Sequence, residues 1–223
     1  RTAKDLNLPV SDADIQALGR SVPDWPVFAD THEALSRLKQ HYQLIILSNV
    51  HEEGVTGSIQ RMDVVFDQVL TAEAIGSYKP SARNFQFLLQ RVGAAGHAPS
   101  QLLHVAQSLF HDHVPAKAAG LDTVWINRRH DKPGWGATPN PGVAVQADLT
   151  FTSLAAFADA VDAAGISCLR RNLADRRTES ADDGVFLHRH DVAEAACQLC
   201  NLLRVNRFQA REGHDFRRNA ALG

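Results

Sequence analysis

Polar side chains that could take part in catalysis follow three apolar runs of the sequence. Ser48 and Asn49, a hydroxyl and an amide, come directly after the run LIIL. The ammonium of Lys79 lies in the segment SYKPS beyond the second run, and the carboxylate of Asp112 lies in HDH after the run LLHV. An ammonium close to a carboxylate favours its charged form. Together, these residue types at the ends of apolar runs predict a single site.

The apolar runs that would position these side chains are short and alternate with helical patterns. We predict buried strands over residues 44–47, 66–70, 102–105, 123–126 and 149–151. We predict helices over residues 30–41, 81–93 and 153–165. The first helix would begin at an Asp30 or Thr31 cap, and the last would stop at Gly165. This alternation predicts an α/β fold, a Rossmann-like parallel sheet with helices on both faces.

The sheet architecture brings the polar residues together. Ligands bind at the carboxyl ends of the strands in such sheets, so Ser48, Lys79 and Asp112 should converge on one edge. Gln107 and Ser108 follow the third predicted strand after Ala106 and should contact a substrate there. Taken singly, each residue has a simpler explanation, such as a turn, a solvated lysine or a helix cap. Their order along the chain and their places at strand ends favour the functional interpretation.

Composition excludes several classes of function. The chain has 223 residues, a net charge of -2 and 44% apolar residues, which is typical of a globular protein. The charge gives no basis for binding nucleic acid, and no run approaches the roughly 20 apolar residues of a membrane helix. All three cysteines lie in the last quarter, so a reducing cytoplasm is expected. A small molecule is the expected partner.

Three segments together resemble a known superfamily. These are LSN after a predicted strand, KP about thirty residues later, and the run DHVPAKAAGLDTVWINR that begins at Asp112. They resemble the second, third and fourth motifs of the haloacid dehalogenase superfamily, and in particular of its type II (L-2-haloacid) dehalogenases. The resemblance covers about residues 8–165. It implies a hydrolase of this superfamily that acts on a small molecule.

The resemblance also implies a role for each site residue. Ser48 would hydrogen-bond an anionic group on the substrate or the nucleophile, and Asn49 would help to bind the substrate or leaving group. Lys79 would keep the nucleophilic carboxylate ionised. Asp112 would complete the acidic cluster, in contact with magnesium in metal-dependent members and without metal in the dehalogenases. Type II dehalogenases tend to pair, so a homodimer is also expected.

The nucleophile itself is missing from the pattern. In the superfamily an aspartate at the end of the first strand, within D-x-x-G-T, attacks the substrate and forms an ester or acyl phosphate. No such string precedes Ser48. Residues 1–29 resemble the end of the helical cap domain, which predicts an N-terminal truncation. The expected domains are a cap remnant at 1–29, a core that lacks its first strand at 30–166, and an extension at 167–223.

The position that decides metal dependence also departs from the superfamily. Phosphatases carry G-D at the end of the fourth strand, where this chain has Ala106 and Gln107. An amide is a weak magnesium ligand compared with a carboxylate. We therefore expect no metal cofactor, with magnesium required only if the chain is a phosphatase. His111 and His113 could suggest a metal site beside Asp112, but adjacent residues point in different directions.

The C-terminal extension differs in composition from the rest. Residues 167–223 contain ten arginines and no lysine. Cys197 and Cys200, with His188 and His190 upstream, are candidate zinc ligands, but their spacing matches no common zinc arrangement. We expect this extension to be largely disordered.

Three functional hypotheses follow. The first is a metal-free, dehalogenase-like hydrolase that, in its complete form, works through an aspartyl ester. The second is a magnesium-dependent small-molecule phosphatase of the same superfamily. The third is a non-catalytic remnant or binding partner.

Overall fold

The strands form two parallel sheets rather than one. The computed structural model describes residue 7 and residues 9–175. In the first sheet β1 (Ile45–Ser48) pairs with β2 (Gln68–Thr71), with Ile45 opposite Gln68. In the second sheet β4 (Asp122–Ile126) lies between β3 (Leu103–Ala106) and β5 (Leu149–Phe151). All pairings are parallel, as the alternating pattern predicts, and each strand lies within two residues of its predicted range.

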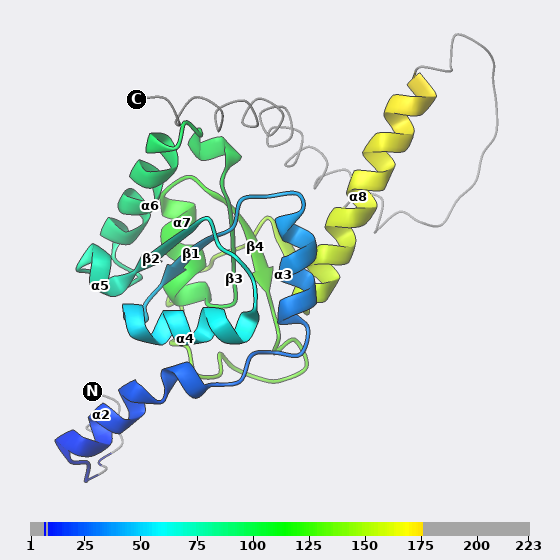
Figure 1. The fold of residues 1–223 in the computed structure, drawn as a ribbon. Coiled ribbons are helices and arrows are strands. Elements are labelled where there is room, and N and C mark those ends of the chain that lie inside the picture. Colours follow the sequence, from blue (N-terminus) through cyan, green and yellow to red (C-terminus); the bar gives the residue numbers. More distant parts are fainter. Residues whose placement is uncertain (1–6, 8, 176–223) are drawn as a thin grey trace, which may run out of the picture.

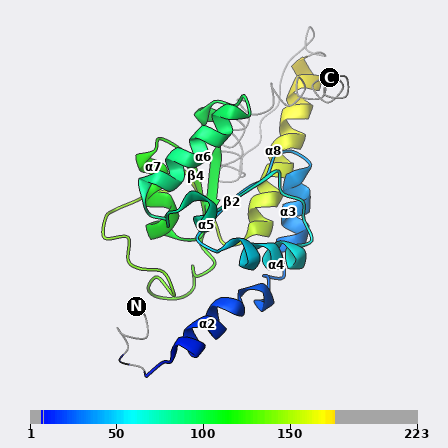
Figure 2. The same ribbon diagram turned by 60° about the vertical axis from the view of Figure 1, so that its left-hand side comes forward.

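Helices cover both faces of the strands (Figures 1 and 2). On one side lie α3 (Thr31–Lys39) and α8 (Leu154–Asp175), and on the other lie α6 (Ala82–Ala94) and α7 (Val114–Ala118). The remaining helical elements that the structure describes are α2 (Asp12–Arg20), η1 (Val22–Asp24), α4 (Glu52–Met62), α5 (Ala72–Ile75), η2 (Pro99–Gln101) and the π-helix η3 (Leu109–His113). This confirms the predicted α/β class with helices on both sides of parallel strands.

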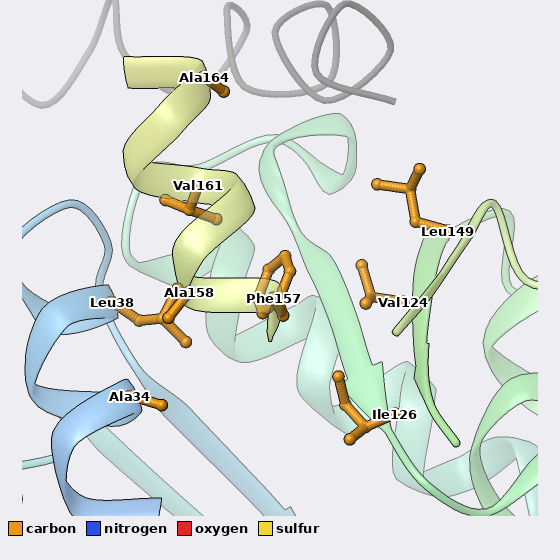
Figure 3. Close-up of a cluster of buried hydrophobic side chains, with 9 residues drawn as sticks. All are labelled: Ala34, Leu38, Val124, Ile126, Leu149, Phe157, Ala158, Val161 and Ala164. Atoms are coloured by element: carbon orange, nitrogen blue, oxygen red, sulfur yellow. The ribbon is translucent and has the colours of Figure 1, made fainter. Parts of the chain in front are cut away.

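A first apolar cluster fills the space between the strands and the α3–α8 pair. Its members come from α3, β4, β5 and α8, as Figure 3 shows: Ala34, Leu38, Val124, Ile126, Leu149, Phe157, Ala158, Val161 and Ala164. Half-buried side chains at residues 44, 103 and 105 pack against this cluster. Both sheets therefore contribute to the same core on this side.

A second apolar cluster lies on the α6 side. It contains Leu70, Ile75, Phe85, Leu88, Val92, Ala116 and Leu121. Half-buried side chains at residues 45, 47 and 102 pack against it. Where β1 and β3 begin, neighbouring side chains thus pack against different clusters, 44 and 45 in one case and 102 and 103 in the other, as side chains on successive extended residues must. The two sheets consequently share the same two faces.

Strand β1 departs from its prediction. The run LIIL predicts a fully buried strand, but all four residues of β1 are half-buried. Among the described residues β1 pairs with a strand on one edge alone, that of β2, and its other edge is therefore uncovered.

Helix α8 is also longer than predicted. It continues beyond Gly165 to Asp175 and therefore crosses the expected domain boundary at 166 (Figure 1). A glycine costs an interior helix position only about 1 kcal/mol, and the alanine, leucine and arginine residues that follow favour a helix. The rest of the predicted extension, with Cys197 and Cys200, lies outside the described residues.

The N-terminal segment lies apart from both clusters. Helix α2 has no buried residue and extends from the body of the molecule (Figures 1 and 2). It begins at Ser11, whose side chain and that of Asp14 form a capping box. The segment contacts the rest of the described chain through η1, which packs against α4. Arg61 Nε donates to the carbonyl oxygen of Pro23 at 2.5 Å, and a second guanidinium nitrogen of Arg61 donates to Asp24 Oδ1 at 3.0 Å. The identity of this segment as a cap remnant stays a prediction.

Asp30 connects two distant parts of the chain. It precedes α3, but its side chain makes no capping bond there. Instead Oδ2 accepts hydrogen bonds from the backbone N–H groups of Leu154 and Ala155, at 2.9 and 3.1 Å, at the start of α8. Its Oδ1 lies 2.9 Å from a guanidinium nitrogen of Arg128. The predicted cap residue thus caps a helix 124 positions away.

We expect Asp30→Ala to lower the free energy of unfolding by about 1–3 kcal/mol, because it removes both a helix cap and a mostly buried ion pair. Urea unfolding measures this change. Asp159→Ala is the matched control, since the Asp159 side chain is 68% exposed in its pair with Arg37. Its expected cost is within about 0.5 kcal/mol. Equal losses in the two variants would contradict this role for Asp30.

Candidate functional site

A buried lysine joins the carboxyl ends of the two sheets. Lys79 Nζ donates to the backbone carbonyl of Leu47 in β1 at 2.8 Å. The same nitrogen donates to Asp112 Oδ1, in the π-helix after β3, at 2.6 Å. The Lys79 and Asp112 side chains are only 11% and 9% exposed. The structure therefore brings these two predicted site residues into direct contact.

Asn49 holds the backbone of Lys79. Its Nδ2 donates to the carbonyl oxygen of Lys79 at 3.0 Å, and its Oδ1 accepts from the Lys79 N–H at 2.7 Å. Both ends of the amide are therefore engaged by the chain. Asn49 therefore positions the Lys79 backbone, and its predicted contact with a substrate stays a prediction.

Ser48 and Gln107 line the same cavity as the lysine. Ser48 Oγ accepts a hydrogen bond from the backbone N–H of Val50 at 3.2 Å, which leaves its own proton available for donation. The backbone carbonyl of Gln107 accepts from Trp125 Nε1 at 2.9 Å, and this bond fixes the end of β3 against β4.

Ser108 is buried and caps the π-helix. Its Oγ accepts from the backbone N–H of His111 at 3.0 Å and lies 3.1 Å from His111 Nδ1. It is absent from the cavity wall. Its side chain therefore has a local structural role, and its carbonyl oxygen accepts from the backbone N–H of Asp112 at 3.1 Å. Its predicted contact with a substrate stays a prediction.

His104 is a further residue of this site, and it was not predicted from the sequence. His104 Nε2 lies 3.2 Å from Asp112 Oδ1, and its ring packs edge-on against Phe85. The available signal was one imidazole inside the otherwise apolar run LLHV, because a polar group on a buried strand normally has a partner.

Asp112 remains ionised in this environment. Burial by itself raises the pKa of its carboxyl group. The hydrogen bond with His104 and the positive charge of Lys79 lower this pKa by more than burial raises it, so the net shift is downward. The buried ammonium thus has a stable carboxylate partner at neutral pH.

His113 is fully buried beside this group. Its Nε2 lies 3.0 Å from the carbonyl oxygen of Ala106. Burial lowers the pKa of His113, and the bond to Ala106 only partly offsets this effect. The ring is therefore neutral at pH 7 and donates to the carbonyl.

A cavity of about 590 Å³ lies between the two sheets. One side is formed by residues 44–48, which comprise β1 and the residue before it. The other side is formed by residues 102–107, which comprise β3 and the residues next to it. We call it the central cavity. Its walls are mostly apolar, with Leu38 and Phe157 from the α3–α8 face and Leu88 from the α6 face. Ser48, Lys79, Gln107 and Asp112 line it where β1 and β3 end, and this end is the candidate site.

The donor set at this end does not fit magnesium. Of the described residues that line the central cavity, Asp112 alone carries a carboxylate, and an ammonium occupies its Oδ1. Magnesium favours charged oxygen ligands in octahedral geometry. Across the part of the chain that the structure describes, no three His, Cys, Asp or Glu side chains are grouped to hold a metal ion.

We expect Lys79→Met to lower the free energy of unfolding by about 3–5 kcal/mol, because it leaves the Asp112 charge buried and unpaired. Lys79→Met combined with Asp112→Asn should lose less than the sum of the single changes, as urea unfolding of all four proteins would show. Lys117→Met is the control, since the Lys117–Asp148 pair is about one-third exposed and should be worth about 1 kcal/mol or less. An equal cost for both lysines would refute the importance of the buried pair.

The depressed pKa of His113 makes stability depend on pH. Below about pH 6.5 an unfolded histidine takes up a proton that the folded protein resists. The stabilisation is complete above that pH and is lost as the pH falls toward the folded pKa. His113→Gln keeps a donor for Ala106 and should flatten this slope, by at most about 1.4 kcal/mol per pH unit. Denaturant unfolding from pH 7.5 to 5 measures it, and an unchanged slope would count against a neutral buried ring.

Known proteins resemble this chain in sequence and in fold. The family model for haloacid dehalogenase-like hydrolases matches residues 15–126, half of the chain. The (S)-2-haloacid dehalogenase 4A of Burkholderia cepacia is 31% identical over 115 residues, which are 50% of this chain and 48% of that protein. The pyrimidine 5'-nucleotidase PynA of Streptococcus pneumoniae is 29% identical over 121 residues, 53% of this chain and 50% of the relative. The chain spans about half the length of these curated relatives.

Among solved structures, the L-2-haloacid dehalogenase of Xanthobacter autotrophicus has the same fold. The TM-score is 0.58 at 16% identity, with 72% of this chain and 71% of that chain covered. The family match, which covers half of the chain, agrees with this fold. This chain belongs to the haloacid dehalogenase-like hydrolase family.

Proposed function

We propose that this chain contributes to the metal-independent hydrolysis of a small 2-haloacid. The observation that carries the proposal is the buried Lys79 ammonium at the polar end of the central cavity, bound to a strand-end carbonyl and to Asp112. An ammonium so placed favours the charged form of a second carboxylate beside it. A charged carboxylate is the nucleophile that such a reaction needs.

The proposed reaction proceeds in two steps. The carboxylate attacks C2 of the haloacid, a carbon–oxygen bond forms, and the carbon–halogen bond breaks with release of halide. Water then hydrolyses the ester, which frees the carboxylate and a 2-hydroxyacid. Lys79 would hold the attacking group ionised, the Ser48 hydroxyl would donate to it, and Asn49 would fix the Lys79 loop.

The attacking carboxylate has to come from outside the described residues. Asp112 is the one acidic side chain among the described residues that line the central cavity, and both Lys79 and His104 contact it. We propose that a carboxylate from outside the described residues supplies the nucleophile. This interpretation agrees with the absence of D-x-x-G-T before Ser48.

A magnesium-dependent phosphatase is the second candidate. The similarity to a pyrimidine 5'-nucleotidase favours it. The donor set around Asp112 counts against it, because the cavity wall offers magnesium too few charged oxygens. For either activity we propose a cytoplasmic location, since the three cysteines all lie at or beyond position 168.

We expect the 223-residue chain to release no halide from L-2-chloropropionate. The same chain, extended at its N-terminus by an apolar strand that ends in D-x-x-G-T, should release chloride in the presence of EDTA. Lys79→Ala in the extended protein should lower kcat by about 100-fold, the order expected for loss of one electrostatic group at a reacting centre. Chloride release is followed with an ion-selective electrode.

Lys117→Ala is the control for this assay, because the lysine is paired at the surface and lies outside the central cavity. It should leave kcat within about twofold of the parent. Magnesium-stimulated hydrolysis of p-nitrophenyl phosphate, without chloride release, would establish the phosphatase instead. If the extended protein folds but shows neither activity, the result supports the non-catalytic hypothesis.

A further inference from the structure

Two donors meet at a single oxygen of Asp112. Lys79 Nζ lies 2.6 Å from Oδ1, and His104 Nε2 lies 3.2 Å from the same atom. An unprotonated Nε2 would turn its lone pair toward the carboxylate, which is repulsive, so Nε2 carries a proton and donates it. The imidazole and the ammonium therefore hold the carboxylate together.

The imidazole is the more rigidly held of the two donors. His104 is the second residue of β3, and its backbone is in register with Thr123 of β4. Its ring packs edge-on against Phe85 of α6, with the ring centroids 5.2 Å apart, and edge-on against His113 at 6.4 Å. Only 9% of His104 is exposed, so the ring has little room to turn.

The lysine reaches the same carboxylate through a flexible side chain. Lys79 lies on the loop between α5 and α6, and its ammonium stands on a flexible four-carbon stem. Asn49 fixes the Lys79 backbone, but two bonds of its own fix the ammonium, to Leu47 O and to Asp112 Oδ1. If the carboxylate moves, the ammonium keeps one bond and can turn about it.

The direction of the remaining N–H of Lys79 therefore depends on Asp112. A lysine ammonium has three donors, and two of them are occupied here. Lys79 lines the central cavity, so the third donor is the one left for the attacking carboxylate of the proposed reaction. An error of about 1 Å in the position of such a group can cost about 100-fold in rate. A residue that fixes Asp112 thus affects the rate through it.

We propose that His104 is a positioning residue of this site: it fixes the Asp112 carboxylate, which in turn fixes the direction of the Lys79 ammonium. The effect on turnover rests on the proposed function, whereas the positioning itself does not. The alternative is a structural role in which the ring only fills space beside Phe85. Positioning requires a donor at the place of Nε2, but filling space requires only bulk.

The first test uses the unmodified 223-residue chain with its histidines labelled with nitrogen-15. A long-range proton–nitrogen spectrum at neutral pH shows which ring nitrogens carry a proton, with the ring signals assigned through the backbone. We expect a proton on His104 Nε2. A ring protonated on Nδ1 alone would overturn the proposal, because Nε2 could then not donate to Asp112. This test does not depend on the stability of any variant.

Two amide variants separate the two roles. The amide nitrogen of glutamine can take the place of Nε2, whereas that of asparagine lies one bond closer to the backbone, at the place of Nδ1. His104→Gln should therefore keep the bond to Asp112, and His104→Asn should lose it. Both variants replace the ring by an uncharged amide, so each serves as the control for the other.

The ammonium of Lys79 reports the difference. The chain has five lysines, and Lys79→Met identifies the Lys79 signal in a proton–nitrogen spectrum of the lysine-labelled chain. We expect the parent signal in His104→Gln and its loss or displacement in His104→Asn. Lys117, which pairs with Asp148, is the internal reference and should give the same signal in both variants.

Turnover is measured with the extended protein of the chloride assay. His104→Asn should lower kcat by about 10- to 100-fold, the order found when a partner that orients a reacting group is lost. KM should stay within about threefold, since the proposed contact of His104 is with Asp112 and not with the substrate. His104→Gln should keep kcat within about threefold of the parent.

Equal Lys79 signals in the two amide variants, whether both are unchanged or both are lost, would overturn the proposal and establish the structural role. A difference between the two signals without chloride release by the extended protein would uphold the positioning and count against the proposed function. Chloride release at equal kcat in both variants, with an unchanged Lys79 signal, would do the reverse.

Discussion

One buried ammonium connects the two halves of this molecule at their functional end. Lys79 Nζ reaches a carbonyl of β1 and a carboxylate that follows β3, so the relative position of the two sheets depends on it. Burying a charge is costly unless it is paired and hydrogen-bonded, and here Asn49 fixes the lysine backbone while His104 completes the environment of Asp112. The same contacts hold an ammonium at one end of a mostly apolar cavity.

The central cavity follows from an incomplete pattern of strand pairing. Two core clusters cover both half-sheets, yet the edges of β1 and β3 face a gap. This accounts for the half-burial of every residue in β1, although its sequence is that of a central parallel strand. The proposed function requires a carboxylate at the end of this cavity where Lys79 lies.

Much of this arrangement could be predicted from the sequence. Short apolar runs fix the strands, and the rule for parallel sheets places Ser48, Lys79 and Asp112 near one edge. The order of apolar and polar residues along the chain could not show which group each polar side chain binds. Ser108 caps the π-helix, and Asp30 caps α8 across 124 residues, because tertiary contacts decide both. The separation into two sheets could not be predicted either, because a sequence pattern gives the order of the strands along the chain but not which strands pair.

Amide hydrogen exchange of the unmodified chain tests the central claim most directly. If β1 and β3 each have one unpaired edge, the backbone amides of these strands that face the central cavity should exchange rapidly, while those of β4, paired on both sides, should be strongly protected. Residue-resolved exchange at neutral pH measures the contrast. Equal protection of all amides in β1, β3 and β4 would contradict it, because both edges would then already have hydrogen-bond partners.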